Sequence, residues 1–581
     1  MIPLAGLPPA RPAEATTDRC GARLRRGCLL KHARMIGMSS LPVQLAQRIQ
    51  AVAGIDPELR SATKPQFGHF QSNVALRLAK QSGGQPRQIA QRIVDRLQVA
   101  DLCEPPEIAG PGFINLRLRT DVLAATVNDQ LADPRSGIVP ATDPQVVVID
   151  YSSPNVAKQM HVGHLRSTII GDCFNRVLTA LGHRVIAQNH IGDWGRQFGM
   201  LIEQVADEGL DLASLDLAGA EALYRRANQR LERDPQFAER ARKRVVALQS
   251  GDAQTLADWR RLIEISLAGF NRTYARLNVL LTDADVDGES SYNAALPGIA
   301  EDLAARGIAR SDRGALVVFA DGFDAPAIIR NSAGGFGYDS TDVAAIKYRV
   351  EQLHVDRIIY VTDARQARHF HLAFAVARLA GYLPDTVQAE HVGFGMVLGV
   401  NGTPIRTRDG GAVSLDSLLD AAEEHAAPQI AIAAIKYADL SNSLQKDYVF
   451  DAERMAKTQG DTGPYLQYAH SRCAGILGEA TARGLAWSRV TELDDPAEQQ
   501  LALCLTRFGE TVQLVADELT PHKLCIYLFE LATAFSTFYE KCKVLQSAGA
   551  VRASRLALVA ATRLVLAKGL ELLGIEAPDR M

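Results

Sequence analysis

The sequence predicts an α/β fold in which a domain built on a parallel sheet lies between a small α/β unit and an all-α bundle. A run of β-branched residues at 146–149 leads through a Ser/Pro/Asn turn into a helical pattern, as where a buried parallel strand meets a helix. Beyond residue 415 the apolar spacing is helical almost throughout. With 581 residues the chain is too long for one core, so we expect roughly three or four domains.

Composition limits the class of protein. Hydrophobic residues make up 47% and charged residues 22%, as in an ordinary soluble globular protein. The net charge is −3, so a nucleic-acid surface would have to be a local basic patch. The eight cysteines form no CxxC pair and no Cys/His cluster, so we expect no metal site, no disulfides and a reducing cytoplasmic location. No apolar run approaches the ~20 residues that span a bilayer.

The first 37 residues differ from the rest of the chain. They contain four prolines, six arginines, one lysine and two acidic residues, without sustained periodicity. An Arg-rich, acid-poor start also occurs in transit peptides, but Ser enrichment and a clear amphipathic helix are missing. We interpret residues 1–37 as a disordered extension or a start assigned upstream, with Met35 or Met38 as the natural first residue.

Residues 38–135 predict a small α/β domain. Segments 41–52 and 89–97 have the apolar spacing of helices. A Gly/Pro turn and an alternating strand follow at 108–118.

The segment 145–172 carries the most chemistry. Here His161-Val-Gly-His164 begins a helical pattern directly after the strand and its turn. Backbone N–H groups and the helix dipole favour anions at such a position, and Gly163 lets a base or phosphate approach the backbone. His161 and His164 can face one ligand from the first helical turn. Two histidines at a helix start are more often capping residues, but the strand before and the helix after them favour a nucleotide phosphate site.

The motif and its flanks resemble a known family. Tyr151-Ser-Ser-Pro-Asn-Val-Ala-Lys158 followed by HVGHLRSTIIGD resembles the HIGH-motif region of class I aminoacyl-tRNA synthetases, and more narrowly that of bacterial-type arginyl-tRNA synthetases. The resemblance runs from about residue 41 to the end. It implies an additional tRNA-binding domain at 38–135, a Rossmann-like HIGH-motif catalytic domain at 136–400 with a helical insertion at about 196–278, a loop with linker helices at 401–459, and a helical anticodon-binding domain at 460–581.

Further elements of the catalytic domain follow the first strand. A second strand at 184–189 leads into His190-Ile-Gly-Asp-Trp-Gly195, which resembles the family's HxGDWGxQFG stretch. Residues 196–278 predict helices that cap the tRNA acceptor end, with most of their many charges on a solvated face. Strand-like sequence resumes at 315–319, 357–362 and 391–398.

The resemblance also implies an arginine pocket. Tyr338 and Asp342 are four residues apart on one face of a predicted helix. A carboxylate accepts the planar guanidinium fork in a bidentate way, and the resemblance assigns that role to Asp342, with Tyr338 beside it. Glu289 and Gln366 match positions that line the pocket, and Asn155 matches the one that holds the substrate's amino-acid end. Any one of these acids alone would more often be a surface residue, but five matches at family spacings argue against coincidence.

The second nucleotide motif departs from the family pattern. Where a KMSK loop is expected, the chain reads Asn401-Gly-Thr-Pro-Ile-Arg-Thr-Arg-Asp-Gly-Gly411, with Pro404 in place of the first lysine. We interpret it as a mobile loop whose Arg406 and Arg408 clamp the β- and γ-phosphates. The resemblance implies that Lys158, just before the histidine motif, compensates for the missing lysine. The expected catalytic residues are His161, His164, Lys158, Arg406 and Arg408, and those expected to bind ATP are His161, Gly163 and His164.

The resemblance places tRNA contacts near both ends of the chain. Phe67, Gln71 and Asn73 would contact RNA by stacking and hydrogen bonding, although Phe67 and Phe70 could equally fill a small core. Ala469, Tyr539 and Met581 would lie near the anticodon loop, although Tyr539 could equally be a half-buried bundle residue. The helical part also contains three apolar stripes that predict a bundle core. Their residues are Leu501, Cys504, Leu505, Phe508, Val512 and Val515, then Leu524, Leu528, Leu531, Phe535 and Phe538, then Leu556, Val559, Leu564, Ala567 and Leu570.

The resemblance therefore implies a ligase that uses ATP and Mg²⁺ to activate L-arginine and transfers it to the terminal adenosine of tRNA(Arg). It adds that tRNA is usually needed for the first step and that the enzyme is a monomer. A cytidylyltransferase that shares the HIGH fold would be shorter and lack the helical RNA domain. A non-catalytic tRNA-binding paralogue would have a damaged HVGH motif or Tyr338/Asp342 pair. A synthetase for another amino acid would leave Glu289 and Asp342 without a cationic substrate, and the absence of an identifiable editing domain fits a cation-selective pocket.

Overall fold

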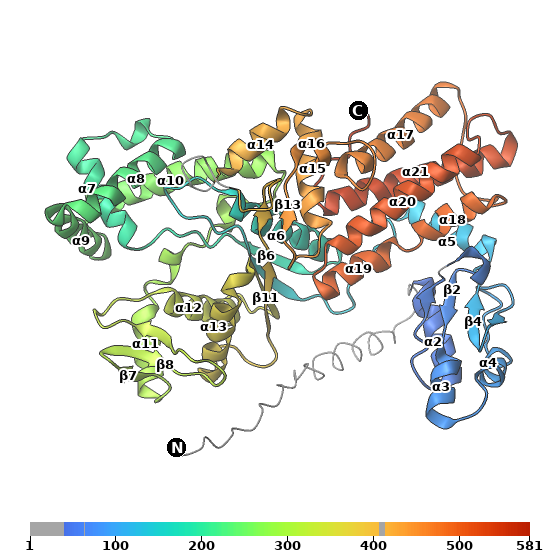
Figure 1. The fold of residues 1–581 in the computed structure, drawn as a ribbon, viewed down its shortest axis with the longest axis horizontal. Coiled ribbons are helices and arrows are strands. Elements are labelled where there is room, and N and C mark those ends of the chain that lie inside the picture. The colour runs from blue at the N-terminus through green and yellow to red at the C-terminus, as the bar shows by residue number, and fades with distance from the viewer. Residues whose placement is uncertain (1–39, 63, 406–412) are drawn as a thin grey trace, which may run out of the picture.

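The computed structural model describes residues 40–62, 64–405 and 413–581. The predictions for residues 1–37, Arg406 and Arg408 lie outside these residues. Figure 1 shows the N-terminal unit in blue at one end of the molecule, beside the orange and red C-terminal helices, and a group of green helices at the opposite end.

The N-terminal unit is an antiparallel sheet with helices packed on it, in agreement with the predicted α/β character. Its strands pair in the order β1-β2-β4-β3. The helical spacing of the first segment is explained by Leu45 and Ile49, which are fully buried. The elements are α2 (Leu41–Ala53), β1 (Arg60–Ser61), η1 (Pro65–Phe67), β2 (Phe70–Ser72), α3 (Val74–Ser82), α4 (Pro86–Val94), β3 (Glu107–Ala109) and β4 (Phe113–Leu116).

Helix α5 (Thr120–Ala132) packs away from this unit, against α18 (Pro496–Leu505) and α21 (Gly549–Leu572). The Asn128 side chain exchanges two hydrogen bonds with the backbone of Val490, at 2.8 and 2.7 Å. The Gln130 amide donates to the Leu505 carbonyl at 2.8 Å. By its packing, α5 therefore joins the C-terminal helices, whereas the sequence places these residues in the N-terminal domain.

The central sheet positions the histidine motif. Among the described residues, its parallel strands lie in the order β11-β10-β5-β6. Chain connections run from β5 through α6 to β6 on one side, and from β10 through α13 to β11 on the other. The order therefore reverses between β5 and β10, and sheets of this kind bind ligands at the carboxyl ends of the strands at such a point. The bounds are β5 (Val146–Asp150), α6 (Val162–Ala180), β6 (Arg184–Gln188), β10 (Arg357–Asp363), α13 (Ala367–Leu379) and β11 (Gln388–Phe394).

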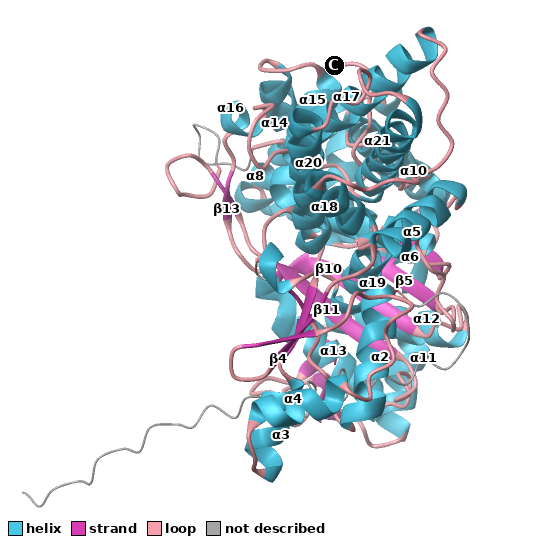
Figure 2. Ribbon diagram, turned by 90° about the vertical axis from the view of Figure 1, so that its right-hand side faces the viewer, coloured by secondary structure: helices cyan, strands magenta, loops and turns pink. Residues whose placement is uncertain are grey.

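The strand β5 shows why the β-branched run was a reliable signal. Val147, Val148 and Ile149 have no exposed surface, as expected for a parallel strand covered on both faces. Figure 2 shows the magenta strands β5, β10 and β11 below the helices of the bundle.

Two of the other predicted strands, at 315–319 and 391–398, do not simply extend the central sheet. Within the predicted strand at 315–319, residues 315–318 form β8, which pairs with β7 and β9 in a separate antiparallel sheet. The predicted strand at 391–398 is divided, because β11 ends at Phe394 and β12 pairs with β13 instead. A side chain at Gly395 would lie 2.8 Å from the Lys446 backbone, so the glycine allows the chain to leave the sheet there. The bounds are α11 (Leu296–Ala305), β7 (Arg310–Asp312), β8 (Ala315–Val318), β9 (Ala327–Arg330), α12 (Tyr338–Glu351), β12 (Val397–Leu398) and β13 (Tyr448–Val449).

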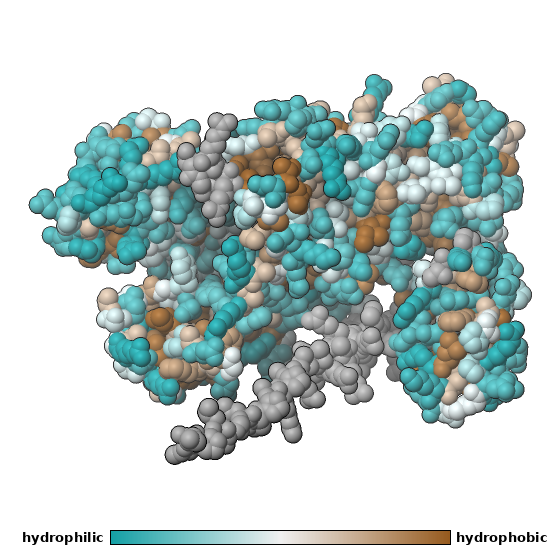
Figure 3. Space-filling view, viewed as in Figure 1, coloured by the Kyte–Doolittle hydropathy of each residue, from teal (hydrophilic) through white to brown (hydrophobic). Residues whose placement is uncertain are grey.

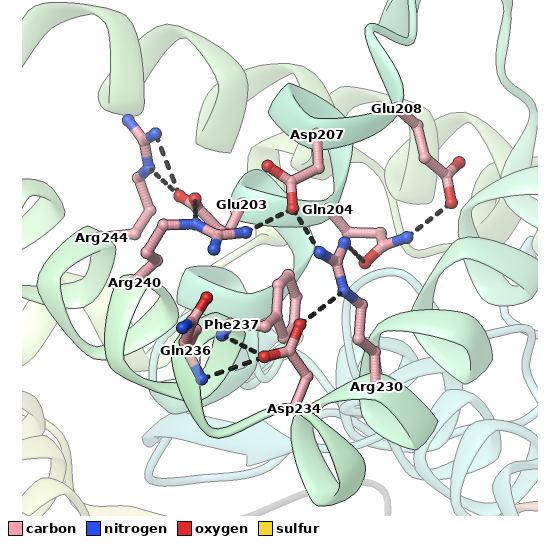
Figure 4. A network of polar contacts seen from close by, with 10 residues as sticks. All are labelled: Glu203, Gln204, Asp207, Glu208, Arg230, Asp234, Gln236, Phe237, Arg240 and Arg244. Atoms are coloured by element: carbon pink, nitrogen blue, oxygen red, sulfur yellow. Dashed lines mark hydrogen bonds and ion pairs between the residues drawn. The ribbon is translucent and has the colours of Figure 1, made fainter.

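The insertion is helical, as predicted, but its charges are not all on a solvated face. Glu203 is almost buried and pairs with Arg240 at 2.7 Å and Arg244 at 3.1 Å. Arg230 joins Asp207 at 2.7 Å. Figure 4 shows that this network links three helices of the insertion, so the Arg/Glu richness partly reflects helix–helix packing. The helices are α7 (Arg196–Glu208), α8 (Leu217–Arg233), α9 (Pro235–Gln249) and α10 (Ala253–Arg276).

The C-terminal part is a helical bundle, as predicted. The second apolar stripe lies on α20 and is fully buried, whereas the first is shared by two helices, because α18 ends at Leu505 and α19 begins at Phe508. None of the helices in the described parts of the chain is long and apolar enough to cross a membrane, and the face shown in Figure 3 is mostly hydrophilic. The remaining helices are α14 (Leu415–Glu423), α15 (Pro428–Leu440), α16 (Ala452–Met455), α17 (Gly463–Ala482), α19 (Phe508–Glu518) and α20 (His522–Lys541).

Candidate active site

The two histidines of the motif cap the helix that follows the central strand β5. His161 is the N-cap residue of α6, and its Nδ1 accepts a hydrogen bond from the Gly163 backbone N–H at 3.0 Å. The Nδ1 of His164 accepts from the backbone N–H of His161, also at 3.0 Å. The two ring centres are 3.9 Å apart. The histidines can therefore both cap the helix and bind a ligand. Capping uses only the Nδ1 of each ring and leaves Nε2 available.

These caps determine which ring nitrogen carries the proton of each neutral histidine. A neutral imidazole whose Nδ1 accepts must carry its proton on Nε2. Burial lowers the pKa of His164 to about 3, with His161 and Lys158 acting in the same direction. Burial and Lys158 also lower the pKa of His161. At neutral pH both rings are uncharged and each has an Nε2–H free of the capping interaction, beside the N–H groups of the first helical turn.

The ends of the glycine-flanked loop lie next to this motif. Val162 donates from its backbone to the Val413 carbonyl at 3.2 Å, and Leu415 donates to the Met160 carbonyl at 2.8 Å. At the other end, Leu398 and Pro404 form an antiparallel bridge. One described end of the loop is thus attached to β12, outside the central sheet, and the other to the histidine motif.

Arg166 lies two residues after His164, and the sequence pattern did not single it out. Its side chain and that of Asp439 are both fully buried and form an ion pair at 3.2 Å. The guanidinium also donates to the carbonyls of Gly395 and Lys446, at 2.9 and 3.0 Å. Arg166 therefore ties α6 to α15 and to the segment where the chain leaves β11. A charged residue in the middle of an apolar helical pattern was the available signal.

Three of the predicted pocket residues, Glu289, Tyr338 and Asp342, lie near one another. Glu289 begins η4 (Glu289–Tyr292), and burial, followed by the Asp193 and Asp342 carboxylates, raises its pKa to about 7. Partial burial, followed by Glu289 and Asp342, also raises the pKa of Tyr338. Glu289, Tyr338 and Asp342 are therefore near one another although they come from η4 and α12.

The other two predicted pocket residues, Asn155 and Gln366, follow the strands β5 and β10 in the chain. Asn155 forms a parallel bridge with Gly192, and a side chain at Gly192 would lie 2.4 Å from the Asn155 Oδ1. The same segment continues to Ile191, whose carbonyl accepts from the Glu289 backbone at 3.1 Å. Gln366 is exposed in η5 (Ala364–Gln366), directly after β10.

Lys158 lies against the helical insertion. Its Nζ is 4.4 Å from the centre of the Tyr224 ring. The neighbouring Gln159 donates from Nε2 to the Glu221 carboxylate at 2.8 Å. Since Tyr224 and Glu221 belong to α8, the insertion contacts the segment directly before the histidine motif.

The residues predicted to contact RNA differ in exposure. In the N-terminal unit Phe70 is buried, with 4% of its surface exposed, so it fills the core. Phe67 stays partly exposed. Gln71 donates to Asn115 at 2.8 Å and Asn73 donates to Glu58 at 3.2 Å. Of the two aromatic residues, Phe70 therefore fills the core, whereas Phe67 keeps exposed surface for an RNA contact.

At the other end, Tyr539 and Met581 are 37% and 49% exposed. The Arg472 guanidinium lies 4.2 Å from the centre of the Tyr539 ring. Ala469 is buried, so in the described conformation its methyl group offers no surface to a base.

A sheet with this strand order, a histidine-capped helix after its central strand and a helical C-terminal bundle define the class I aminoacyl-tRNA synthetases. Three family models match the chain. They are described as the class I (R) tRNA synthetase catalytic domain, over residues 126–452, the arginyl-tRNA synthetase N-terminal domain, over 40–118, and the DALR anticodon-binding domain, over 466–581. The chain belongs to the arginyl-tRNA synthetase family.

Curated relatives and solved structures agree with the family. The arginine–tRNA ligase of Cutibacterium acnes is 65% identical, over 94% of this chain and 100% of that protein. That of Thermobifida fusca is 48% identical, over 92% and 99%. The arginyl-tRNA synthetase structure from Plasmodium falciparum has a TM-score of 0.81 at 28% identity, covering 94% of this chain and all of the other. The one from Thermus thermophilus has a TM-score of 0.75 at 27% identity, covering 93% and 100%.

Proposed function

We propose that this chain is an arginine–tRNA ligase that forms arginyl-adenylate from L-arginine and ATP and transfers the arginyl group to tRNA(Arg). The observation that carries the proposal is the juxtaposition of two sites. A histidine-capped helix N-terminus suited to phosphate lies at the same edge of the sheet as the carboxylates of Glu289 and Asp342. The 65% identity to a curated arginine–tRNA ligase supports it.

In the first step a carboxylate oxygen of arginine attacks the α-phosphorus, the bond to the β-phosphate oxygen breaks, and pyrophosphate leaves. His161 and His164 donate from Nε2 to the phosphate oxygens as charge develops, and Gly163 leaves room at the helix N-terminus. Lys158, with Arg406 and Arg408 of the loop, stabilises the leaving pyrophosphate. Mg²⁺ would accompany ATP as its phosphate complex and would supply neutralisation of the phosphate charge. The described residues contain no cluster of three or more His, Cys, Asp or Glu side chains placed to hold a metal ion.

Arginine is selected by charge and shape. Asp342 accepts the guanidinium, Tyr338 lies beside it and Glu289 contributes a second carboxylate. Gln366 also lines the pocket, and Asn155 holds the amino-acid end. A guanidinium keeps its charge at every physiological pH, so a pocket with partly buried carboxylates rejects neutral side chains.

In the second step the 2′-hydroxyl of the terminal adenosine of tRNA attacks the carbonyl carbon of the adenylate, and AMP leaves. Phe67, Gln71 and Asn73 would contact the tRNA at one end of the molecule, and Ala469, Tyr539 and Met581 lie near the anticodon at the other. We propose a cytoplasmic monomer, and the cysteines at described positions, all free and buried, support a reducing location.

The test is amino-acid-dependent exchange between ATP and pyrophosphate, with each amino acid and with or without total tRNA. Exchange with arginine alone, and only after tRNA is added, is expected. Exchange with another amino acid would overturn the pocket assignment and leave the fold untouched. Absence of exchange in a folded preparation would favour an RNA-binding protein without catalytic activity.

The state of Glu289 makes arginine use depend on pH. With a pKa of about 7 in the empty pocket, Glu289 is mostly protonated at pH 6 and mostly ionised at pH 8. A guanidinium favours the carboxylate form, so its binding lowers the Glu289 pKa and releases a proton. We expect kcat/KM for arginine to rise by up to about 10-fold between pH 6 and 8 and then to level off. Steady-state kinetics at saturating ATP measure this profile.

The control is Glu289→Gln, which has no group to titrate at this position. Its kcat/KM should be lower than wild type at pH 8 and should lack the rise near pH 7. A wild-type profile that is flat between pH 6 and 8, or a rise that persists in the variant, would show that Glu289 does not control arginine binding.

A further inference from the structure

A histidine that no sequence motif identified is bonded to the carboxylate proposed to bind arginine. His369 lies in the first turn of α13, and its Nε2 is 2.5 Å from the Asp342 Oδ2. Its Nδ1 is 3.3 Å from the Asp339 Oδ1. Asp339 and Asp342 are three residues apart on α12, so one imidazole ring bridges two acids on the same helix face.

The other oxygen of Asp339 is also held. Asp339 Oδ2 accepts a hydrogen bond from the backbone N–H of Ile328, in β9, at 2.7 Å. A continuous series of polar contacts therefore runs from the backbone of β9 through Asp339 and His369 to Asp342. The side chains of His369, Asp339 and Asp342 are 29%, 26% and 14% exposed, so water screens these contacts only in part.

The bridge defines the charge of the ring. An ionised carboxylate can only accept hydrogen bonds, so a ring that bonds two of them donates from both nitrogens and is an imidazolium. In agreement with this geometry, the hydrogen bonds to Asp339 and then to Asp342 raise the pKa of His369 to about 10, against the effect of burial. The two acids and the ring together carry a charge of −1, which a single guanidinium neutralises.

We propose that His369 is a positioning residue for the amino-acid substrate, which holds the Asp342 carboxylate in the orientation that accepts a guanidinium. The inference rests on the proposed function, in which Asp342 binds arginine. A carboxylate has about four acceptor positions, and His369 uses one of them on Oδ2, so the guanidinium can bind without displacing the ring. The ring also offsets the repulsion between Asp339 and Asp342, which would otherwise turn the Asp342 side chain away. Binding to a carboxylate that is already oriented costs less conformational entropy.

The test is His369→Ala in the full-length enzyme, assayed by arginine-dependent ATP–pyrophosphate exchange with tRNA present. We expect KM for arginine to rise on the order of 10-fold, while kcat at saturating arginine and KM for ATP stay within about 2-fold of wild type. A role confined to general folding would change all three constants or the melting temperature. Added imidazole should partly restore KM for arginine, because the ring it replaces is partly exposed.

The matched control is Arg368→Ala. Arg368 precedes His369 in the same turn of α13 and pairs at 2.9 Å with Asp324, away from Asp342. Like His369→Ala, Arg368→Ala removes a cation that pairs with an acid, but it should leave KM for arginine unchanged. If His369→Ala does not fold, Asp339→Asn replaces it, since this change loosens the ring from the other side and should raise the same constant.

Two results would overturn the inference. An unchanged KM for arginine would show that Asp342 is oriented without His369. A lower KM would show that the ring competes with arginine for the carboxylate. A wild-type enzyme without arginine-dependent exchange would contradict the proposed function itself. If the wild type exchanges, an unchanged or lower KM in His369→Ala contradicts only the role of His369.

Discussion

Asp342→Asn is expected to lower kcat/KM for arginine by roughly 30- to 5,000-fold, with KM for ATP within about 2-fold of wild type. The estimate follows from leaving a buried cation without its charged partner, which costs about 2–5 kcal/mol. Asn has nearly the same shape and can still accept from His369 through Oδ1, so the loss concerns charge and the second acceptor oxygen. Because the guanidinium is bound in both the ground and transition states, most of the effect should fall on KM. Arginine-dependent pyrophosphate exchange over a wide arginine range measures it.

The matched control is Glu351→Gln, which removes a carboxylate from the same helix α12. Glu351 forms an ion pair with Lys347 at the other end of the helix, outside the pocket. It should leave kcat/KM for arginine within about 2-fold of wild type, because exposed pairs of this kind contribute little. Citrulline provides a second check, since its neutral urea has the shape of the guanidinium. Asp342→Asn should reduce the preference for arginine over citrulline, and an unchanged preference would mean that another group selects the charge.

The parts of the fold that the sequence predicted are those that local signals determine. The strand β5 is buried apart from Val146 and is almost wholly β-branched, and the histidine motif follows it at a helix N-terminus. The pattern at 315–319 was equally strand-like, but strand propensity does not specify a partner, and β8 joins a different sheet. Likewise, α5 has ordinary helical spacing, and only its packing against α18 and α21 shows to which domain it belongs.

Candidate site residues could be proposed where the family resemblance supplies a spacing, and not where a contact joins distant residues. The resemblance assigns Asp342 and Glu289 to the arginine pocket, and their carboxylates suit a guanidinium. His369 is 27 positions from Asp342 and on another helix, and a histidine in an amphipathic pattern carries no signal of its partner. The ion pair of Arg166 with Asp439 spans a still longer stretch of chain. Such contacts arise from the way α6, α12, α13 and α15 pack, which the sequence specifies only as a whole.

His164 has two roles that one substitution can separate. Its Nδ1 caps the helix by accepting from the His161 backbone, and its Nε2–H is the proposed donor to the α-phosphate. In His164→Asn the side-chain oxygen can take the place of Nδ1, so the cap is kept while the outer donor is lost. We expect kcat to fall about 10²- to 10³-fold, the usual effect of removing one donor to a developing negative charge, with KM for arginine little changed. Single-turnover formation of arginyl-adenylate, with tRNA present, measures the step directly.

His183→Asn is the control for this design, because His183 makes the same kind of contact outside the site. Its Nδ1 accepts from the Gln145 backbone at 3.1 Å, just before β5. If the caps alone mattered, both variants would keep nearly normal rates, since Asn preserves an acceptor in each. If the outer nitrogen acts on the phosphate, only His164→Asn becomes slow while its melting temperature stays near that of wild type. A normal rate in His164→Asn would therefore restrict His164 to the cap and move the charge stabilisation to His161, Lys158 and the loop.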